Sequence, residues 1–151
     1  MIKLEIIKQK YFWDCGPACL AMIFCYYKKC LNYPEILKMT KVMHGTDNIE
    51  MKKIAEKIGF RTFMKENSSF KDIKKFTKKK IPVIVNYIEP TMNWGHYSVV
   101  VGINSKMKLA NPDTSKEEEW EFKEFEKRWI SGSGKYKRWM LAVFEPIPLQ
   151  N

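Results

Sequence analysis

Cys15 is the residue best placed to act as a nucleophile. It precedes Gly16-Pro17 and an apolar run from Ala18 to Tyr27. Proline suits the first turn of a helix because it has no N–H and its φ angle is fixed. Cys15 should therefore lie at a helix N-terminus, where the helix dipole and unpaired N–H groups favour a thiolate over a thiol. Such a thiolate can attack a carbonyl carbon.

A reactive thiolate also needs a histidine and a group that orients that histidine. His96 follows Gly95 and opens a β-branched run, so its ring is expected at a sheet edge beside a loop. Asn111 ends the next predicted strand, and antiparallel neighbours bring the start of one strand near the end of the other. The amide of Asn111 could then reach the ring. Asp113 is the alternative, but Asn111 is preferred because the strand should end at Pro112.

Gln9 is the expected donor to a developing oxyanion. It lies six positions before Cys15, so its amide N–H could point at the same carbonyl as the backbone N–H of Cys15. The negative charge of Asp14 would raise the pKa of the thiol, so Asp14 is expected instead to tie down the loop by hydrogen bonds. Trp94, beside His96, either lines a cleft or simply packs.

Helices dominate the first half of the predicted structure and strands dominate the second. The predicted helices cover 16–29, 34–41 and 47–59, a segment that starts at Ser69, and 117–130. The predicted strands cover 2–7, 60–64, 82–88, 97–103, 107–110 and 138–144. Ile49, Ile54 and Ile58 should face the core from one helix, and Phe122, Phe125 and Trp129 from another. This order indicates an α+β fold.

Length, composition and charge restrict the class of protein. A chain of 151 residues should form a single domain, 1–151, with its own core. The longest apolar run is too short for a membrane span, and no signal peptide is visible, so we expect a cytoplasmic location. The net charge of +10 comes from lysines spread over polar helix faces. We therefore expect no nucleic-acid partner, while an acidic peptide would suit the charge.

The cysteines all lie in the first thirty residues, at Cys15, Cys19, Cys25 and Cys30. Three of them fall on one predicted helix in a chain expected to stay reduced, which argues against disulfides. Their spacing also argues against a zinc site, and no cofactor is expected. Cys19 and Cys25 should pack as small apolar residues. Cys30 has no predicted role, and His44 is expected in a turn or at the surface.

Short motifs follow one another in a fixed order along nearly the whole chain. They are Gln9-x₅-Cys15-Gly16-x₂-Cys19, Gly45-Thr46, Pro82 to Val85, Gly95-His96-Tyr97 with Val99 to Ile103, Leu109 to Pro112, and Glu124-Phe125-Glu126-x₂-Trp129. Together they resemble the C39 peptidase family and its C39-like relatives. That family usually carries aspartate where this chain has Asn111. An amide can hold the histidine tautomer, but it stabilises an imidazolium less than a carboxylate does.

The resemblance implies a papain-like cysteine peptidase fold, with N-terminal helices packed on a C-terminal antiparallel sheet. It implies a cysteine endopeptidase with Cys15, His96, Asn111 and Gln9 as its catalytic residues. The substrate would be a peptide or precursor protein, cleaved after Gly-Gly in a leader, and the partner an ABC exporter. Two alternatives are a non-hydrolytic peptide-binding module and an acyltransferase that uses an amine. The retained Cys15, His96 and Gln9 argue against the first.

Overall fold

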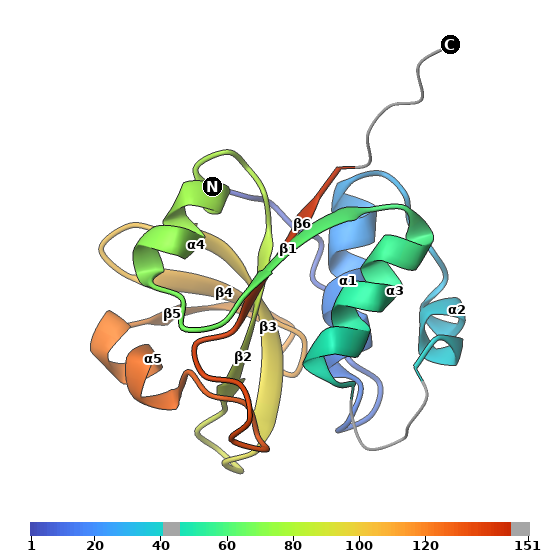
Figure 1. The fold of residues 1–151 in the computed structure, drawn as a ribbon. Coiled ribbons are helices and arrows are strands. Elements are labelled where there is room, and N and C mark those ends of the chain that lie inside the picture. Colours follow the sequence, from blue (N-terminus) through green and yellow to red (C-terminus); the bar gives the residue numbers. More distant parts are fainter. Residues whose placement is uncertain (41–45, 146–151) are drawn as a thin grey trace.

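A six-stranded antiparallel sheet forms the centre of the part of the chain that the computed structural model describes, residues 1–40 and 46–145. The strand order is β1-β6-β2-β3-β4-β5 (Figure 1). The strands are β1 (Arg61–Lys65), β2 (Val83–Ile88), β3 (Gly95–Ile103), β4 (Met107–Asn111), β5 (Lys116–Trp120) and β6 (Met140–Phe144). The helices are α1 (Cys15–Tyr26), α2 (Tyr33–Lys38), α3 (Asn48–Ile58), α4 (Phe70–Thr77) and α5 (Phe122–Arg128). The expected α+β class is confirmed.

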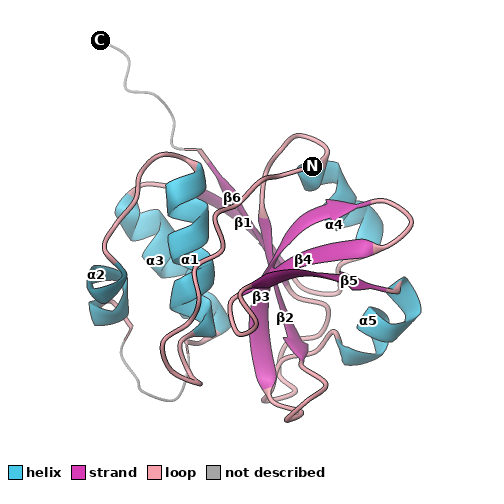
Figure 2. Cartoon of the chain, turned by 180° about the vertical axis from the view of Figure 1, so that it is seen from behind, coloured by secondary structure: helices cyan, strands magenta, loops and turns pink. Residues whose placement is uncertain are grey.

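The helices divide between two sides of the sheet. In Figures 1 and 2, α1, α2 and α3 gather on one side, while α4 and α5 lie on the other. Each side has its own cluster of buried side chains. Leu20, Ile23, Ile54 and Leu141 belong to the α1–α3 cluster. Ile73, Leu109, Phe125 and Met140 belong to the cluster beneath α4 and α5.

Local sequence fixes the ends of α3 and α4. The Asp47 side chain accepts from the N–H of Ile49 and caps α3, and Gly59 ends it in a left-handed conformation with φ 109°. Ser69 and Asp72 form a reciprocal capping box at the start of α4. Ile54 is buried as predicted, but the inward position predicted for Ile49 is wrong, since its exposed fraction is 40%.

The register between β3 and β4 shifts at one point, between Val100 and Gly102. Val100 pairs with Leu109, whereas Gly102 pairs with Lys108, so Val101 is left between two registers. The carbonyl of Val101 accepts the N–H of Ile2 at 3.0 Å. This bond fastens the start of the chain to β3. The strand predicted over 2–7 is wrong, because that segment has no assigned strand.

Three other predictions about the fold need correction. The helix predicted over 117–130 is instead strand β5 followed by the shorter α5. The absence of disulfides is also wrong, because Cys25 and Cys30 are bonded to each other, with Cα atoms 4.2 Å apart. Helix α1 ends at Tyr26, and Lys28 takes a φ of 60°, which turns the chain back toward the helix. The prediction had extended the helix to residue 29.

Candidate active site

Cys15 is the first residue of α1 and is 7% exposed. The first helical hydrogen bond runs from the N–H of Ala18 to the carbonyl of Asp14. The N–H groups of Cys15 and Gly16 therefore have no helical acceptor. The thiol thus lies beside backbone donors at the positive end of a helix, as the sequence predicted.

Asp14 holds the loop before Cys15, also as predicted. Its carboxylate accepts from the backbone N–H groups of Lys10 at 3.0 Å and Tyr11 at 2.8 Å, and from the hydroxyl of Tyr33 at 2.6 Å. It makes no side-chain cap on α1. Because the Asp14 carboxylate bonds to Lys10, Tyr11 and Tyr33, it does not occupy the N–H donors at the start of α1.

His96 and Asn111 meet across β3 and β4. A ring nitrogen of His96, Nε2, lies 2.8 Å from Oδ1 of Asn111. Both residues are buried, each with an exposed fraction of 6%. The pairing of Val99 with Ala110 fixes the register that brings them together. The sequence argument from antiparallel neighbours therefore placed these two side chains correctly.

The hydrogen bonds of Asn111 determine which way its amide points. Its Oδ1 also accepts the backbone N–H of Asp113 at 2.9 Å, while its Nδ2 donates to Oε1 of Glu118 at 2.9 Å. Nε2 of His96 must then be the donor to Oδ1, so Nδ1 is the ring nitrogen left to face another group. Asp113 supplies a backbone N–H and is itself exposed, so Asn111 is the residue in contact with the ring.

Burial and the neighbouring side chains act in opposite directions on the pKa of His96. Burial on its own disfavours the imidazolium and lowers the pKa of His96. The interaction with Cys15 opposes this, followed by the hydrogen bond to Asn111 and the charge of Asp113. The net result is a pKa of His96 above its ordinary value. The side chains around His96 therefore favour its protonated form.

Gln9 is tied to the same end of the sheet by its backbone. Its N–H donates to the carbonyl of Pro112 at 2.9 Å. Its side-chain Nε2 donates to the carbonyl of Tyr11 at 2.8 Å, and its Oε1 is buried without a hydrogen-bond partner. Gln9 does not line the pocket described next. The structure thus places Gln9 near the strand end that carries Asn111, with its amide on the loop before Cys15.

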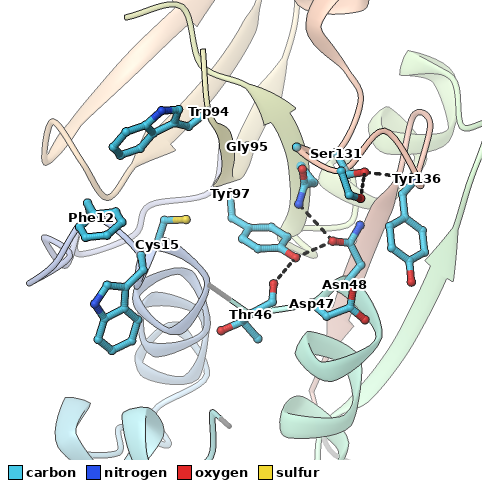
Figure 3. A pocket seen from close by; sticks show the side chains of 14 residues that line it. Phe12, Cys15, Thr46, Asp47, Asn48, Trp94, Gly95, Tyr97, Ser131 and Tyr136 are labelled. Carbon is cyan, nitrogen blue, oxygen red and sulfur yellow. Dashed lines mark hydrogen bonds between the residues drawn. The ribbon is translucent and has the colours of Figure 1, made fainter. Parts of the chain in front are cut away.

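A pocket of about 440 Å³ opens beside Cys15. In Figure 3 the sulfur of Cys15 points into it, with the rings of Phe12 and Trp94 on one side and Tyr97 on the other. Phe12 and Trp94 are 69% and 47% exposed, and their rings pack edge to face. Trp94 therefore lines the cleft. Exposed aromatic rings of this kind suit apolar side chains of a bound peptide.

Polar residues that the sequence analysis did not single out line the far part of the pocket (Figure 3). Oδ1 of Asn48 accepts from Tyr97 at 2.5 Å and from Asn86 at 3.1 Å. The hydroxyl of Tyr97 also approaches the carbonyl of Thr46 at 2.7 Å. The presence of Asn86 within the buried strand Val-Ile-Val-Asn-Tyr-Ile was the sequence feature that could have revealed this cluster.

Glycines form a tight wall of the pocket. A Cβ atom added to Gly95 would lie 2.8 Å from the backbone nitrogen of Gly132. The start of β3, and with it His96, therefore packs against the segment around Gly132 with no room for a side chain. His44 and Gly45 lie outside the described residues. Within the part of the chain that is described, no group of three or more His, Cys, Asp or Glu could hold a metal ion, and no helix has the length and apolarity to cross a membrane.

Comparison with known proteins shows the family and the fold of the chain. The model of the Peptidase C39 family matches residues 3–133. The chain therefore belongs to the Peptidase C39 family, a family of cysteine peptidases. Among curated proteins, the mesentericin transport/processing ATP-binding protein MesD of Leuconostoc mesenteroides is 30% identical over 116 residues. That match covers 75% of this chain and 16% of MesD, so the chain spans about one sixth of this relative.

Solved structures show the same fold. A double glycine motif protease from an AMS/PCAT transporter, in complex with its leader peptide, aligns with a TM-score of 0.75 and 21% identity, covering 96% of this chain and 93% of that one. The peptidase domain of Streptococcus ComA, a bifunctional ABC transporter, aligns with a TM-score of 0.74 and 24% identity, covering 98% and 100%. The expected papain-like arrangement is confirmed.

Proposed function

We propose that this chain cleaves peptides with Cys15 as nucleophile, His96 as general base and acid, and Asn111 as the residue that orients His96. The observation that carries the proposal is the 2.8 Å contact from Nε2 of His96 to Oδ1 of Asn111, with Cys15 acting on the same ring. Nδ1 takes the proton of the thiol, and the resulting imidazolium returns it to the leaving amine. Water then releases the acyl group from Cys15.

The oxyanion is stabilised by the backbone N–H of Cys15 and by the amide of Gln9. The N–H of Cys15 has no helical acceptor because it belongs to the first turn of α1. The Gln9 amide donates to Tyr11 in the free protein, so it must exchange that bond for the substrate oxygen. The backbone bond from Gln9 to Pro112 holds its Cα while the side chain turns.

The proposed substrate is the leader peptide of a precursor, cleaved after a Gly-Gly pair, and the proposed partner is an ABC exporter. The support comes from similar proteins, namely a double glycine motif protease bound to a leader peptide and the peptidase domain of a bifunctional transporter. The exposed rings of Phe12 and Trp94 at the pocket would contact apolar leader side chains.

Alkylation by iodoacetamide tests the nucleophile directly. Cys15 in the folded protein should react below pH 7 much faster than Cys15 of the same chain unfolded in urea, as read by mass spectrometry of the labelled peptide. His96→Ala should remove the difference, whereas Lys123→Ala, an exposed change on α5, should leave it intact. Equal rates for the folded and unfolded chains would rule out the proposed nucleophile.

Cleavage of a synthetic leader tests the substrate. A peptide that contains Gly-Gly should be cut after the second glycine, and Cys15→Ala should abolish the cut. Replacing the pair by Leu-Leu should prevent cleavage while the alkylation of Cys15 is unchanged. Cleavage of both peptides at equal rates would contradict the proposed specificity but not the proposed mechanism.

A further inference from the structure

Behind Asn111 lies a carboxylate that the catalytic proposal does not use. Glu118 is on β5, where it pairs with Leu109 of β4, and Asn111 pairs with Lys116. Glu118 and Asn111 are thus diagonal neighbours on one face of the β4–β5 ladder. Oε1 of Glu118 accepts from Nδ2 of Asn111 at 2.9 Å, and its Oε2 is 3.4 Å from the hydroxyl of Thr114.

Glu118 determines the orientation of the Asn111 amide. An amide offers acceptors at its oxygen and donors at its nitrogen. If the amide turned over, its oxygen would face the carboxylate of Glu118, and its NH₂ would face the N–H of Asp113. Both contacts would be repulsive. The observed orientation, with Oδ1 toward His96, satisfies all three neighbours.

Glu118 also places negative charge one hydrogen bond away from the amide. Asn111 is neutral, so on its own it compensates the charge of an imidazolium poorly. A carboxylate bonded to the NH₂ group polarises the amide and makes its oxygen a better acceptor. The groups whose charge is coupled to His96 are Cys15, Asp113 and, from the turn after β2, Glu89. None of them contacts the Asn111 nitrogen.

We propose that Glu118 is a positioning residue that holds Asn111 with its oxygen toward His96 and supplies the negative charge that an asparagine lacks. This inference rests on the proposed roles of Cys15, His96 and Asn111. Glu118, on β5, would be the fourth interacting side chain of the site, after Cys15, His96 and Asn111.

Glu118→Gln is the first test, because it removes the charge and keeps the shape. It should lower kcat for leader cleavage about tenfold with little change in KM, as expected when an interaction with a buried catalytic group loses its charge. It should also move the basic limb of the pH profile of kcat/KM for leader cleavage to lower pH, since the protonated form of His96 loses a stabilising charge. Glu119→Gln is the matched control, because it makes the same change at the next residue of β5, whose side chain points to the opposite face.

Asn111→Asp supplies a second test, in which the sign of the effect reverses. In that background a carboxylate at position 111 would face the carboxylate of Glu118, and the two would repel each other. Glu118→Gln should therefore raise kcat in the Asn111→Asp protein, although it lowers kcat in the unaltered one. A merely structural role for Glu118 would give the same loss in both backgrounds and would overturn the inference.

The histidine tautomer gives an independent readout. In ¹⁵N NMR spectra of the neutral side chain, His96 should carry its proton on Nε2 in the unaltered protein and lose that preference in Glu118→Ala. If Cys15 is not activated in the unaltered protein, the proposed function fails and this inference with it. If Cys15 is activated but Glu118→Gln behaves like Glu119→Gln, only the inference about Glu118 fails.

Discussion

The His96 ring receives opposing influences from its neighbours, and their balance sets its protonation. Burial favours the neutral ring, while Cys15, Asn111 and the charge of Asp113 favour the imidazolium. Because Cys15 is the largest of the influences that raise the pKa of His96, its removal should change the protonation of the ring most clearly. The protonation of His96 thus shows whether the interaction between Cys15 and His96 is present.

Cys15→Ala should lower the pKa of His96, because burial then acts with less opposition. NMR titration can measure this, since the chain contains two histidines, and His44→Gln identifies the second signal. The raised pKa of His96 also makes the free energy of unfolding depend on pH. A pKa raised in the folded state stabilises the protein below the unfolded value of about 6.5 and loses its effect as pH rises through the folded value. Cys15→Ala should therefore lower the free energy of unfolding more at pH 6 than at pH 9. An unchanged His96 titration would contradict this.

The candidate site could be predicted from the sequence only where local features carried the information. Cys15 follows from a helix start, and the approach of His96 to Asn111 follows from the pairing of adjacent strands. Glu118 was missed because the acidic segment around it has the composition of a helix. Its strand conformation depends on pairing with β4, which is a tertiary contact that overrides local propensity.

At the scale of elements, β5 is a charged strand at the edge of the sheet. Its sequence Lys-Glu-Glu-Glu-Trp alternates little, and Glu117 forms an ion pair with Lys108 of β4. Charged edge strands discourage pairing with other chains.

The disulfide was missed because three cysteines were assigned to one helix of a chain expected to stay reduced. In the structure α1 ends at Tyr26, and the turn at Lys28 brings Cys30 back to Cys25. Apolar periodicity, in contrast, predicted β2, β3 and β6 to within two residues.

Gly95→Ala should disturb the start of β3. The new methyl group would lie 2.8 Å and 2.9 Å from backbone atoms of Gly132, which cannot move as a side chain can. We expect a loss of about 1–3 kcal/mol in the free energy of unfolding and a larger loss of cleavage, because His96 is adjacent. Gly102→Ala on the same strand is the control, since it would meet the flexible side chain of Met1. Equal activity of the two variants would contradict the prediction.

The disulfide between Cys25 and Cys30 can be tested by counting free thiols. Protein denatured without reductant should show two reactive thiols, Cys15 and Cys19, and four after reduction. Cys25→Ser with Cys30→Ser should lower the free energy of unfolding by about 2 kcal/mol, because the closed loop is short. Since this pair is remote from Cys15 in the chain, alkylation of Cys15 should persist. Four thiols in the unreduced protein would contradict the bond.

At the scale of the whole molecule, one sheet separates two buried clusters. Leu141 belongs to the cluster under α1–α3, and Leu109 to the cluster under α4 and α5. The sequence led us to expect a single domain. Because both clusters pack on the same sheet, they should unfold together. Neither cluster can be exposed without breaking strands that support the other.

Leu141→Ala and Leu109→Ala should each lower the free energy of one shared unfolding transition. Both side chains are fully buried, so a loss of about 2–5 kcal/mol is expected from each. Urea unfolding followed by circular dichroism and by tryptophan fluorescence should give coincident curves for both variants. Two separate transitions, each shifted by one substitution alone, would show that residues 1–151 do not unfold as one domain.

The position of β6 has a consequence for when the thiol becomes reactive during synthesis. β6 is the last strand among the described residues, yet it lies between β1 and β2. A nascent chain that has emerged from the ribosome only as far as Asn111 already carries Cys15, His96 and Asn111. It still lacks the strand that joins β1 to the rest of the sheet, so Cys15 should react there as an ordinary cysteine. The proposed peptidase activity should therefore begin only after Met140–Phe144 has left the exit tunnel.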